Sequence, residues 1–155
     1  MSKLTHLDKA GEARMVDVSG KPVVHREAVA RGEIRLREET LALIASNSIA
    51  KGNVMATARI AGVLAAKKTG DLIPLCHPLP ITHCDIDFEV PQSRDRIVIT
   101  ATTRIEAKTG VEMEALTAVT VAALTIYDMC KAVDKEMQIT EVKLVSKTKR
   151  AIGEV

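Results

Sequence analysis

Hydrophobic and polar residues alternate along four stretches of the chain, which is the pattern of β-strands that bury one face. These stretches are residues 23–36, 82–90, 96–107 and 137–147. Between the second and the third, residues 91–95 read Pro-Gln-Ser-Arg-Asp, a composition typical of turns. The pattern therefore predicts four strands, two of which form a β-hairpin.

Three other stretches have the composition and hydrophobic spacing that indicate α-helices. Residues 37–48 predict a short helix, and the alanine-rich residues 52–70 predict a longer one with lysines in its last turn and Gly70 as its C-terminal cap. Residues 111–136 predict the longest helix. Because residues 115–127 carry no charge, we expect this helix to be buried on nearly all sides.

The order of these elements is strand, helix pair, hairpin, helix, strand. It predicts the β-α-β-β-α-β plan of an α+β ferredoxin-like fold, with helices packed on one face of an antiparallel sheet. The length fits a single domain over residues 1–155, and we expect residues 1–14 and 149–155 to be flexible. A uniformly apolar helix in so small a domain also favours a contact between subunits.

Composition narrows the classes of function. The chain is 46% hydrophobic and 27% charged, which is typical of soluble globular proteins. It has no Trp, one Phe and one Tyr, so aliphatic residues must fill the core, and aromatic platforms for nucleic-acid bases are absent. A net charge of +2 is too small for a DNA-binding surface. With no secretory signal, no run of ~20 apolar residues and three unpaired-looking cysteines, we expect a cytoplasmic protein without a nucleic-acid or membrane partner.

Two cysteine–histidine pairs, Cys76-His77 and His83-Cys84, lie within nine positions of one another, beside three prolines. Structural zinc sites favour ligands two to four residues apart, whereas adjacent residues of an extended chain point in opposite directions. We therefore expect no metal site here. Cys84 and Cys130 are interpreted as small core residues.

Charged residues at the two ends of the longest helix are candidates for chemistry. Asp128 and Lys131 share a face just after the uncharged stretch, which fits a structural ion pair and an acid–base pair equally well. Glu112 and Glu114 open the helix, where carboxylates usually complement the helix dipole. Glu114 and Asp128 are fourteen residues apart, or about 21 Å. If both act at one site, that site takes them from two subunits or holds a long substrate.

No glycine-rich phosphate-binding loop is present, so any polyphosphate must be held by cationic side chains or helix N-termini. The candidates are Arg26, Lys51, Lys131 and Lys147, each of which can equally be a solvated surface charge.

Two long motifs are specific enough to indicate a family. Residues 71–79, D-L-I-P-L-C-H-P-L, and residues 108–132, which begin K-T-G-V-E-M-E-A-L and end T-I-Y-D-M-C-K-A, closely resemble the cyclic pyranopterin monophosphate synthase family of molybdenum cofactor biosynthesis (molybdenum cofactor biosynthesis protein C). M-V-D-V at 15–18, Lys51-Gly52 and A-T-A-R-I-A-G at 56–62 agree with it. Family members are ferredoxin-like, as the element order already predicts, and form hexamers that are trimers of dimers.

The resemblance implies a lyase that converts a cyclised dihydroguanosine triphosphate, made from GTP by an upstream radical SAM enzyme, to cyclic pyranopterin monophosphate and pyrophosphate. It implies that Asp128 is the catalytic acid/base and that Lys131 and Lys51 are its cationic partners. The implied substrate-binding residues are Leu75, Cys76, His77, Glu112, Met113, Glu114, Lys147 and Arg26. We expect no redox cofactor, although a divalent cation can accompany the triphosphate. The alternative function is a non-catalytic regulator that binds a purine nucleotide or a pterin on the same scaffold.

The chain departs from the family pattern at its C-terminal end. Family members typically carry a glycine-rich K-S-G-G-K-S-G tail, whereas this chain reads S-K-T-K-R-A-I-G-E-V from Ser146. Lys147 matches the first lysine of that tail, and Lys149 or Arg150 is available in place of the second. Near the N-terminus, Val24-His25-Arg26 replaces a Thr-Val-Arg run. If these segments hold the triphosphate, we expect substrate affinity to differ from that of other members.

Overall fold

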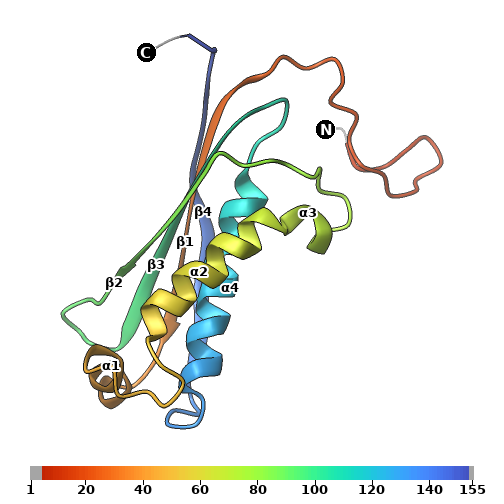
Figure 1. Ribbon diagram of the computed structural model, residues 1–155. Helices are drawn as coiled ribbons and strands as arrows, with labels where there is room; N and C mark the ends of the chain where they lie inside the picture. The colour runs from red at the N-terminus through yellow and green to blue at the C-terminus, as the bar shows by residue number, and fades with distance from the viewer. Residues whose placement is uncertain (1–4, 154–155) are drawn as a thin grey trace.

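The computed structural model of the chain describes residues 5–153. In chain order its elements are β1 (Val24–Arg35), α1 (Glu38–Ala45), α2 (Val54–Lys67), α3 (Thr69–Leu72), β2 (His83–Glu89), β3 (Arg96–Ala107), α4 (Glu112–Cys130) and β4 (Gln138–Arg150). The strands form one antiparallel sheet in the order β2-β3-β1-β4 (Figure 1). This arrangement confirms the predicted α+β ferredoxin-like fold.

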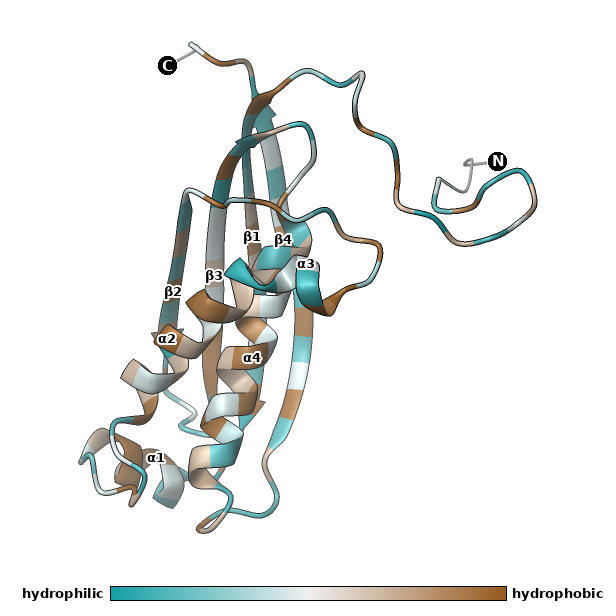
Figure 2. Cartoon of the chain, turned by 45° about the vertical axis from the view of Figure 1, so that its right-hand side comes forward, coloured by the Kyte–Doolittle hydropathy of each residue, from teal (hydrophilic) through white to brown (hydrophobic). Residues whose placement is uncertain are grey.

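Helices α2 and α4 cover one face of the sheet, and the core lies between them and the strands (Figures 1 and 2). Their facing sides are rich in small residues: Ala58, Gly62, Ala65, Ala66, Ala118, Ala122 and Ala123. Gly62 marks the tightest approach, because a Cβ atom there would lie 2.2 Å from Ile86 Cδ1 and 2.9 Å from the Ala118 carbonyl oxygen. A core without large aromatic residues is therefore filled by bringing backbones close together.

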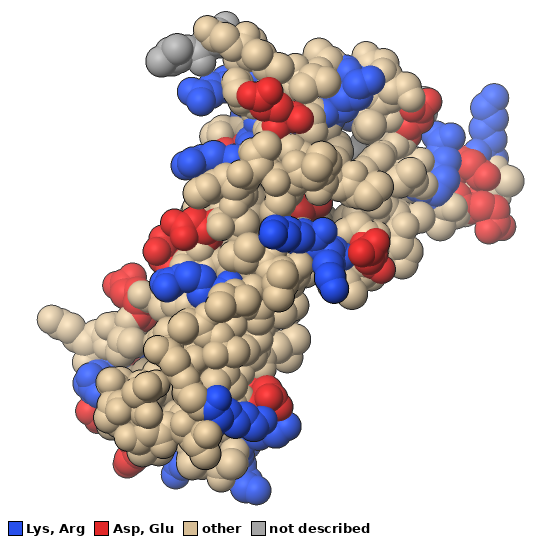
Figure 3. Space-filling model, viewed as in Figure 1, with Lys and Arg blue, Asp and Glu red and all other residues tan. Residues whose placement is uncertain are grey.

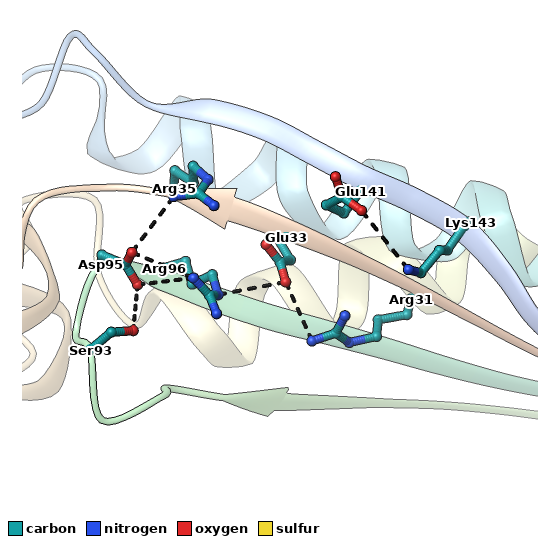
Figure 4. Close-up of polar contacts among 8 residues, drawn as sticks. All are labelled: Arg31, Glu33, Arg35, Ser93, Asp95, Arg96, Glu141 and Lys143. Atoms are coloured by element: carbon teal, nitrogen blue, oxygen red, sulfur yellow. Dashed lines mark hydrogen bonds and ion pairs between the residues drawn. The ribbon is translucent and has the colours of Figure 1, made fainter.

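The opposite face of the sheet carries charged side chains near the turn between β2 and β3 (Figure 4). The buried Glu33 carboxylate lies 3.3 Å from Arg31 Nη2 and 3.5 Å from Arg96 Nε. Arg35 and Arg96 both pair with Asp95 on that turn. One face thus packs on helices and the other is polar, as is common in antiparallel sheets.

The predicted helix at residues 52–70 ends earlier than expected. Helix α2 stops at Lys67, with Lys68 as its C-cap, and Gly70 lies inside the short α3 instead of capping α2. Gly70 has another use, because a Cβ atom there would stand 2.9 Å from the Pro78 Cα atom. The missing side chain allows the loop after α3 to fold back against it.

The predicted helix at residues 111–136 is wrong in two respects. Helix α4 ends at Cys130, where the N–H groups of Val133 and Asp134 both donate to the Cys130 carbonyl and turn the chain. Nor is α4 buried on all sides, since the Leu124 side chain is 52% exposed. Of the described residues only α4 is long and apolar enough to cross a membrane, and half of that stretch is buried against the sheet and α2, as in a core helix.

The two ends of the chain were predicted to be flexible. Lys149 and Arg150 instead continue β4, opposite Arg26 and His25 of β1. At the other end, residues 5–14 contain a turn closed by a bridge between Leu7 and Ala13. Residues 1–4 and 154–155 lie outside the described part of the chain.

Candidate functional site

Lys51, Asp128 and Lys131 meet at the C-terminal end of α4, and we call them the lysine–aspartate cluster. Lys51 Nζ lies 2.9 Å from Asp128 Oδ2, and Lys131 Nζ lies 2.8 Å from Asp128 Oδ1. Lys51 also donates to the Asp128 carbonyl at 3.1 Å, at the helix end where a cation is favoured. All three side chains are about half exposed. The structure thus brings together the three residues expected to be catalytic.

The cluster fixes the charge of its carboxylate. Hydrogen bonds from Lys131 and Lys51, together with their positive charges, lower the pKa of Asp128 to about 2. The same hydrogen bond and charge raise the pKa of Lys131. In the free chain Asp128 is therefore an ionised carboxylate flanked by two ammonium groups, and it carries no proton to donate near neutral pH.

The connection between α1 and α2 places Lys51 in the cluster. Ile49 is buried and anchors this connection in the core. Gly52 follows with φ of +108°, a backbone conformation that favours glycine, and its N–H donates to the Ile49 carbonyl. Asn53 then caps α2 by accepting from the Ala56 N–H. The Lys51-Gly52-Asn53 sequence therefore ends the turn and starts the helix with Lys51 directed at α4.

A second group of expected residues lines a cavity of about 400 Å³ at the N-terminal end of α4, which we call the loop pocket. Its walls come from the segment before β1, the loop after α3 and the first turn of α4. The lining residues used below are Val16, Leu75, Cys76, His77, Glu112, Met113 and Glu114. The volume is in the range of small-molecule sites.

His77 is held by a backbone group. Its Nε2 atom lies 2.7 Å from the carbonyl oxygen of Val16, so Nε2 carries the hydrogen and a neutral ring presents Nδ1 as an acceptor. The prolines around it do not keep the loop fully extended, because the Cys76 N–H donates to the Ile73 carbonyl in a turn. Burial, followed by the charge of Glu114, raises the pKa of the Cys76 thiol, which makes it a poor nucleophile.

Glu114 is a buried acid in the wall of the loop pocket. It is 3% exposed, and burial raises the pKa of its carboxyl to about 6; its own backbone N–H opposes this shift and the charge of Glu112 adds to it. Glu112 lies closer to solvent and accepts from Lys147 Nζ at 3.1 Å. Two neighbouring carboxyls therefore have different environments, and Glu114 can exchange a proton near neutral pH.

Cationic side chains continue from the loop pocket along β1 and β4. A smaller cavity of about 200 Å³ shares Gly110 and Glu112 with the loop pocket and is also lined by Arg26, Lys147 and Lys149. Lys147 lies opposite Ala28 of the buried core, and Lys149 lies opposite Arg26, so all three cations are on the helix-covered side of the sheet. We call Arg26, Lys147 and Lys149 the cation row.

Two members of the cation row are already engaged. Lys147 pairs with Glu112, and Arg26 donates through Nε and Nη2 to the carbonyls of Ala107 and Lys108. Within residues 5–153 no ion pair or hydrogen bond involves the Lys149 side chain. Arg150 lies opposite His25, on the other face of the sheet. Of the two residues considered in place of the second tail lysine, Lys149 is the one near the loop pocket.

The cysteine–histidine pairs separate in the structure. His83 and Cys84 are successive residues of β2; His83 is exposed and Cys84 packs against the core. Cys130 is buried, as interpreted from the sequence. Residues 5–153 contain no group of three His, Cys, Asp or Glu side chains placed to hold a metal ion.

The lysine–aspartate cluster and the loop pocket are at opposite ends of α4. Glu114 is in the first turn and Asp128 in the last, fourteen residues or about 21 Å apart. The structure therefore groups the eleven expected site residues into two separate sets within one chain.

Comparison with known proteins identifies the family. A sequence model of the MoaC family matches residues 15–150. The chain belongs to the MoaC family. Proteins named cyclic pyranopterin monophosphate synthase from Roseiflexus sp. (strain RS-1) and Pelotomaculum thermopropionicum are 61% and 60% identical to it over 148 residues, 96% of this chain and 94% and 87% of theirs. A protein of the same name from Roseiflexus castenholzii is 56% identical over 155 residues, 100% of this chain and 98% of its own. The family expected from the motifs is confirmed.

Sequence reasoning missed two parts of the candidate site in this MoaC-family chain. The Val16 carbonyl that binds His77 is 61 residues away and has no side-chain signal, although residues 15–18 belong to one of the matching motifs. Lys149 was considered only as a substitute within a tail, because the extension of β4 to Arg150 was not predicted.

Proposed function

We propose that the chain is a cyclic pyranopterin monophosphate synthase, a phosphorus–oxygen lyase that acts on a cyclised dihydroguanosine triphosphate. Its membership of the MoaC family and the printed names of relatives at 56–61% identity support this function. The observation that carries it is that residues expected from the family motifs converge in space, as the lysine–aspartate cluster and as the loop pocket with its adjoining cation row.

The loop pocket is the proposed binding site for the purine-derived ring of the substrate. Opening and reclosing a purine-derived ring needs several proton transfers. Glu114, with a pKa near 6, can give or take a proton at neutral pH, and His77 offers Nδ1 as an acceptor while Val16 holds its other nitrogen. Leu75 and Met113 supply apolar walls, and Cys76 stays a neutral thiol that packs and does not attack.

The cation row is the proposed site of the triphosphate. Closing the cyclic phosphate forms a bond from a sugar hydroxyl oxygen to the α-phosphorus and breaks the bond from that phosphorus to the bridging oxygen. The electron pair leaves with pyrophosphate. Arg26, Lys147 and Lys149 can neutralise the charge that develops on this leaving group. Lys147 exchanges its Glu112 partner for phosphate, and Lys149 replaces the second lysine of the family tail.

The lysine–aspartate cluster is the proposed second half of the catalytic machinery. Asp128 accepts a proton and the two ammonium groups stabilise negative charge on the substrate. Because this cluster lies about 21 Å from Glu114 in the same chain, the active site joins the cluster of one subunit to the loop pocket of another. The family resemblance implies a homo-oligomer, a trimer of dimers, in which two subunits can share an active site in this way.

Apolar side chains on the helix side support subunit contact. Figure 3 shows a broad uncharged surface over α2 and α4 between groups of charged side chains. These two helices carry large apolar side chains that are exposed to solvent in the single chain: Ile60 and Leu64 on α2 and Leu124 on α4. An uncovered apolar surface on a small domain favours association. We propose a cytoplasmic hexamer that uses no redox cofactor, because the reaction transfers protons and phosphate, and that accepts a divalent cation with the triphosphate.

The direct test supplies purified protein with the cyclised triphosphate and measures the pterin product and pyrophosphate. The proposal expects one pyrophosphate per pterin formed. Replacement of Asp128 or Lys131 by Ala should abolish product without changing the oligomer. Tight binding of the triphosphate without any turnover would contradict the enzyme and support the alternative, a purine-nucleotide or pterin-binding regulator.

A further inference from the structure

Helix α1 receives its N-terminal cap from a residue far along the chain. Its own N-cap residue, Arg37, makes no capping hydrogen bond through its side chain. Instead the Asp134 carboxylate accepts from the Arg37 N–H at 3.0 Å and from the Thr40 hydroxyl at 2.9 Å. Its other oxygen accepts from the Glu136 N–H at 3.1 Å, and the residue is 1% exposed. A buried carboxylate therefore joins α1 to the turn after α4.

The two segments that Asp134 joins are those that carry the lysine–aspartate cluster. Lys131 lies three residues before Asp134, in the turn that ends α4. Helix α1 leads directly into the connection that holds Lys51. The approach of Lys51 to Asp128 therefore depends on how α1 sits against the end of α4.

The hydrogen bonds of Asp134 are stronger than the ion pairs of Asp128, so they hold Lys51 in its position more firmly than those ion pairs do. The Lys51–Asp128 and Lys131–Asp128 pairs are half exposed, and exposed ion pairs contribute little to holding a structure together. Asp134 is buried, and burial alone would raise its pKa, but the N–H groups of Arg37 and Glu136 and the Thr40 hydroxyl lower it, with a smaller effect of the Arg37 charge. Hydrogen bonds to such a buried, ionised carboxylate are stronger and costly to break. The positive end of α1 favours the same charge.

We propose that Asp134 is a positioning residue that holds Lys51 against Asp128 by fastening α1 to the end of α4, with Thr40 as its buried side-chain partner. This inference rests on the proposed function of the lysine–aspartate cluster. Asp134 itself is buried and does not contact the cluster through its side chain, so its effect passes through the backbone of α1 and of the turn.

The test compares four variants of the full chain. Asp134→Asn keeps the shape and replaces one accepting oxygen by a donor, whereas Thr40→Val removes the hydroxyl from a side chain of the same shape. Thr40→Ser restores the hydroxyl, and Glu38→Gln removes an exposed carboxylate from the same end of α1. We expect kcat to fall about 10- to 100-fold in Asp134→Asn and less in Thr40→Val, with KM within about twofold. Thr40→Ser and Glu38→Gln should resemble the unmodified chain.

A second readout does not depend on turnover. Acylation of lysines by acetic anhydride, which transfers an acetyl group to the amine and releases acetate, is quantified by peptide mass spectrometry and reports how firmly each lysine ammonium is held. Lys51 should be acylated several-fold faster in Asp134→Asn and Thr40→Val, because a displaced ammonium is less protected. Lys108, which donates to the Ser19 carbonyl at the far end of the molecule, should keep its rate.

The two readouts separate the inference from the proposed function. Faster acylation of Lys51, with the rate of Lys108 unchanged, supports the positioning role whether or not the unmodified chain forms product. A lack of product from the unmodified chain would overturn the proposed function and leave the positioning role standing. Unchanged acylation of Lys51 in a folded Thr40→Val protein overturns the inference. An equal loss of kcat in Glu38→Gln does so as well, because it assigns the effect to general destabilisation of α1.

Discussion

The clearest physical consequence of the loop pocket is the pH dependence that Glu114 gives to stability. Its carboxyl has a pKa of about 6 in the fold against an ordinary value of 4.5, mainly because it is buried. A difference of this size corresponds to roughly 2 kcal/mol of unfolding free energy. The fold binds this proton more tightly than the unfolded chain does. Glu114 therefore contributes stability below pH 4.5 that is lost as the pH rises through 6.

Replacing Glu114 by Gln removes this pH-dependent term, because the amide stays neutral. We expect Glu114→Gln to be more stable than the unmodified chain by about 1–2 kcal/mol at pH 8 and to match it near pH 4. Urea unfolding at several pH values and one protein concentration measures the difference. The same variant should lose activity, since Gln cannot transfer the proton.

Glu112→Gln is the matched control on the same turn of α4. Glu112 is paired with Lys147 and closer to solvent, and its charge is the smallest of the causes that act on the pKa of Glu114, so its replacement should bring a much smaller gain at pH 8 than Glu114→Gln does. A Glu114→Gln protein that is less stable than the unmodified chain at pH 8, or whose advantage is the same at pH 4 and pH 8, would refute the assignment of a raised pKa to burial.

Three further predictions follow from the other parts of the molecule. Asp128 stays ionised down to about pH 2, so a side-chain carboxyl carbon of the site that titrates near pH 6 in NMR spectra should belong to Glu114 and be absent from Glu114→Gln; its persistence in that variant would contradict the assignment. Lys149→Ala should raise KM several-fold and weaken its salt dependence, whereas Lys143→Ala, opposite Arg31 on the other face of the sheet, should change neither; equal effects would show that only net charge matters. Gly62→Ala should lower the unfolding free energy by on the order of 2 kcal/mol in a denaturant titration, since its Cβ would overlap Ile86; unchanged stability would mean that α2 and α4 are not tightly packed.

Local patterns predicted β1, β2 and β3 well because each of these strands has one buried and one more open face. Residues 83–89 and 96–107 alternate between core and surface in the structure, as they do in the sequence. The end of α4 was not predictable in this way. Nothing near Asp134 signals a stop, because its hydrogen-bond partners Arg37 and Thr40 lie more than ninety residues earlier.

The candidate site was predictable mainly where a motif carried it. Spacing along α4 showed that Glu114 and Asp128 share a helix and lie far apart, and α4 contains both. The pairing of Lys51 with Asp128 spans 77 residues and came from the family resemblance alone. Backbone partners such as the Val16 carbonyl have no sequence signal, so the way His77 is held required the structure.

Mixing two inactive variants tests most directly the claim that each active site joins the ends of α4 from two subunits. Asp128→Ala removes the lysine–aspartate cluster, and Glu114→Gln removes the proton exchange in the loop pocket. In oligomers assembled at random from equal amounts of both chains, a site is intact only when its lysine–aspartate cluster comes from a Glu114→Gln chain and its loop pocket comes from an Asp128→Ala chain. About one quarter of the sites should satisfy this condition and restore about one quarter of the synthase activity. Mixed oligomers that remain as inactive as the separate variants would contradict the account, because a site built within one chain cannot be repaired by its neighbour.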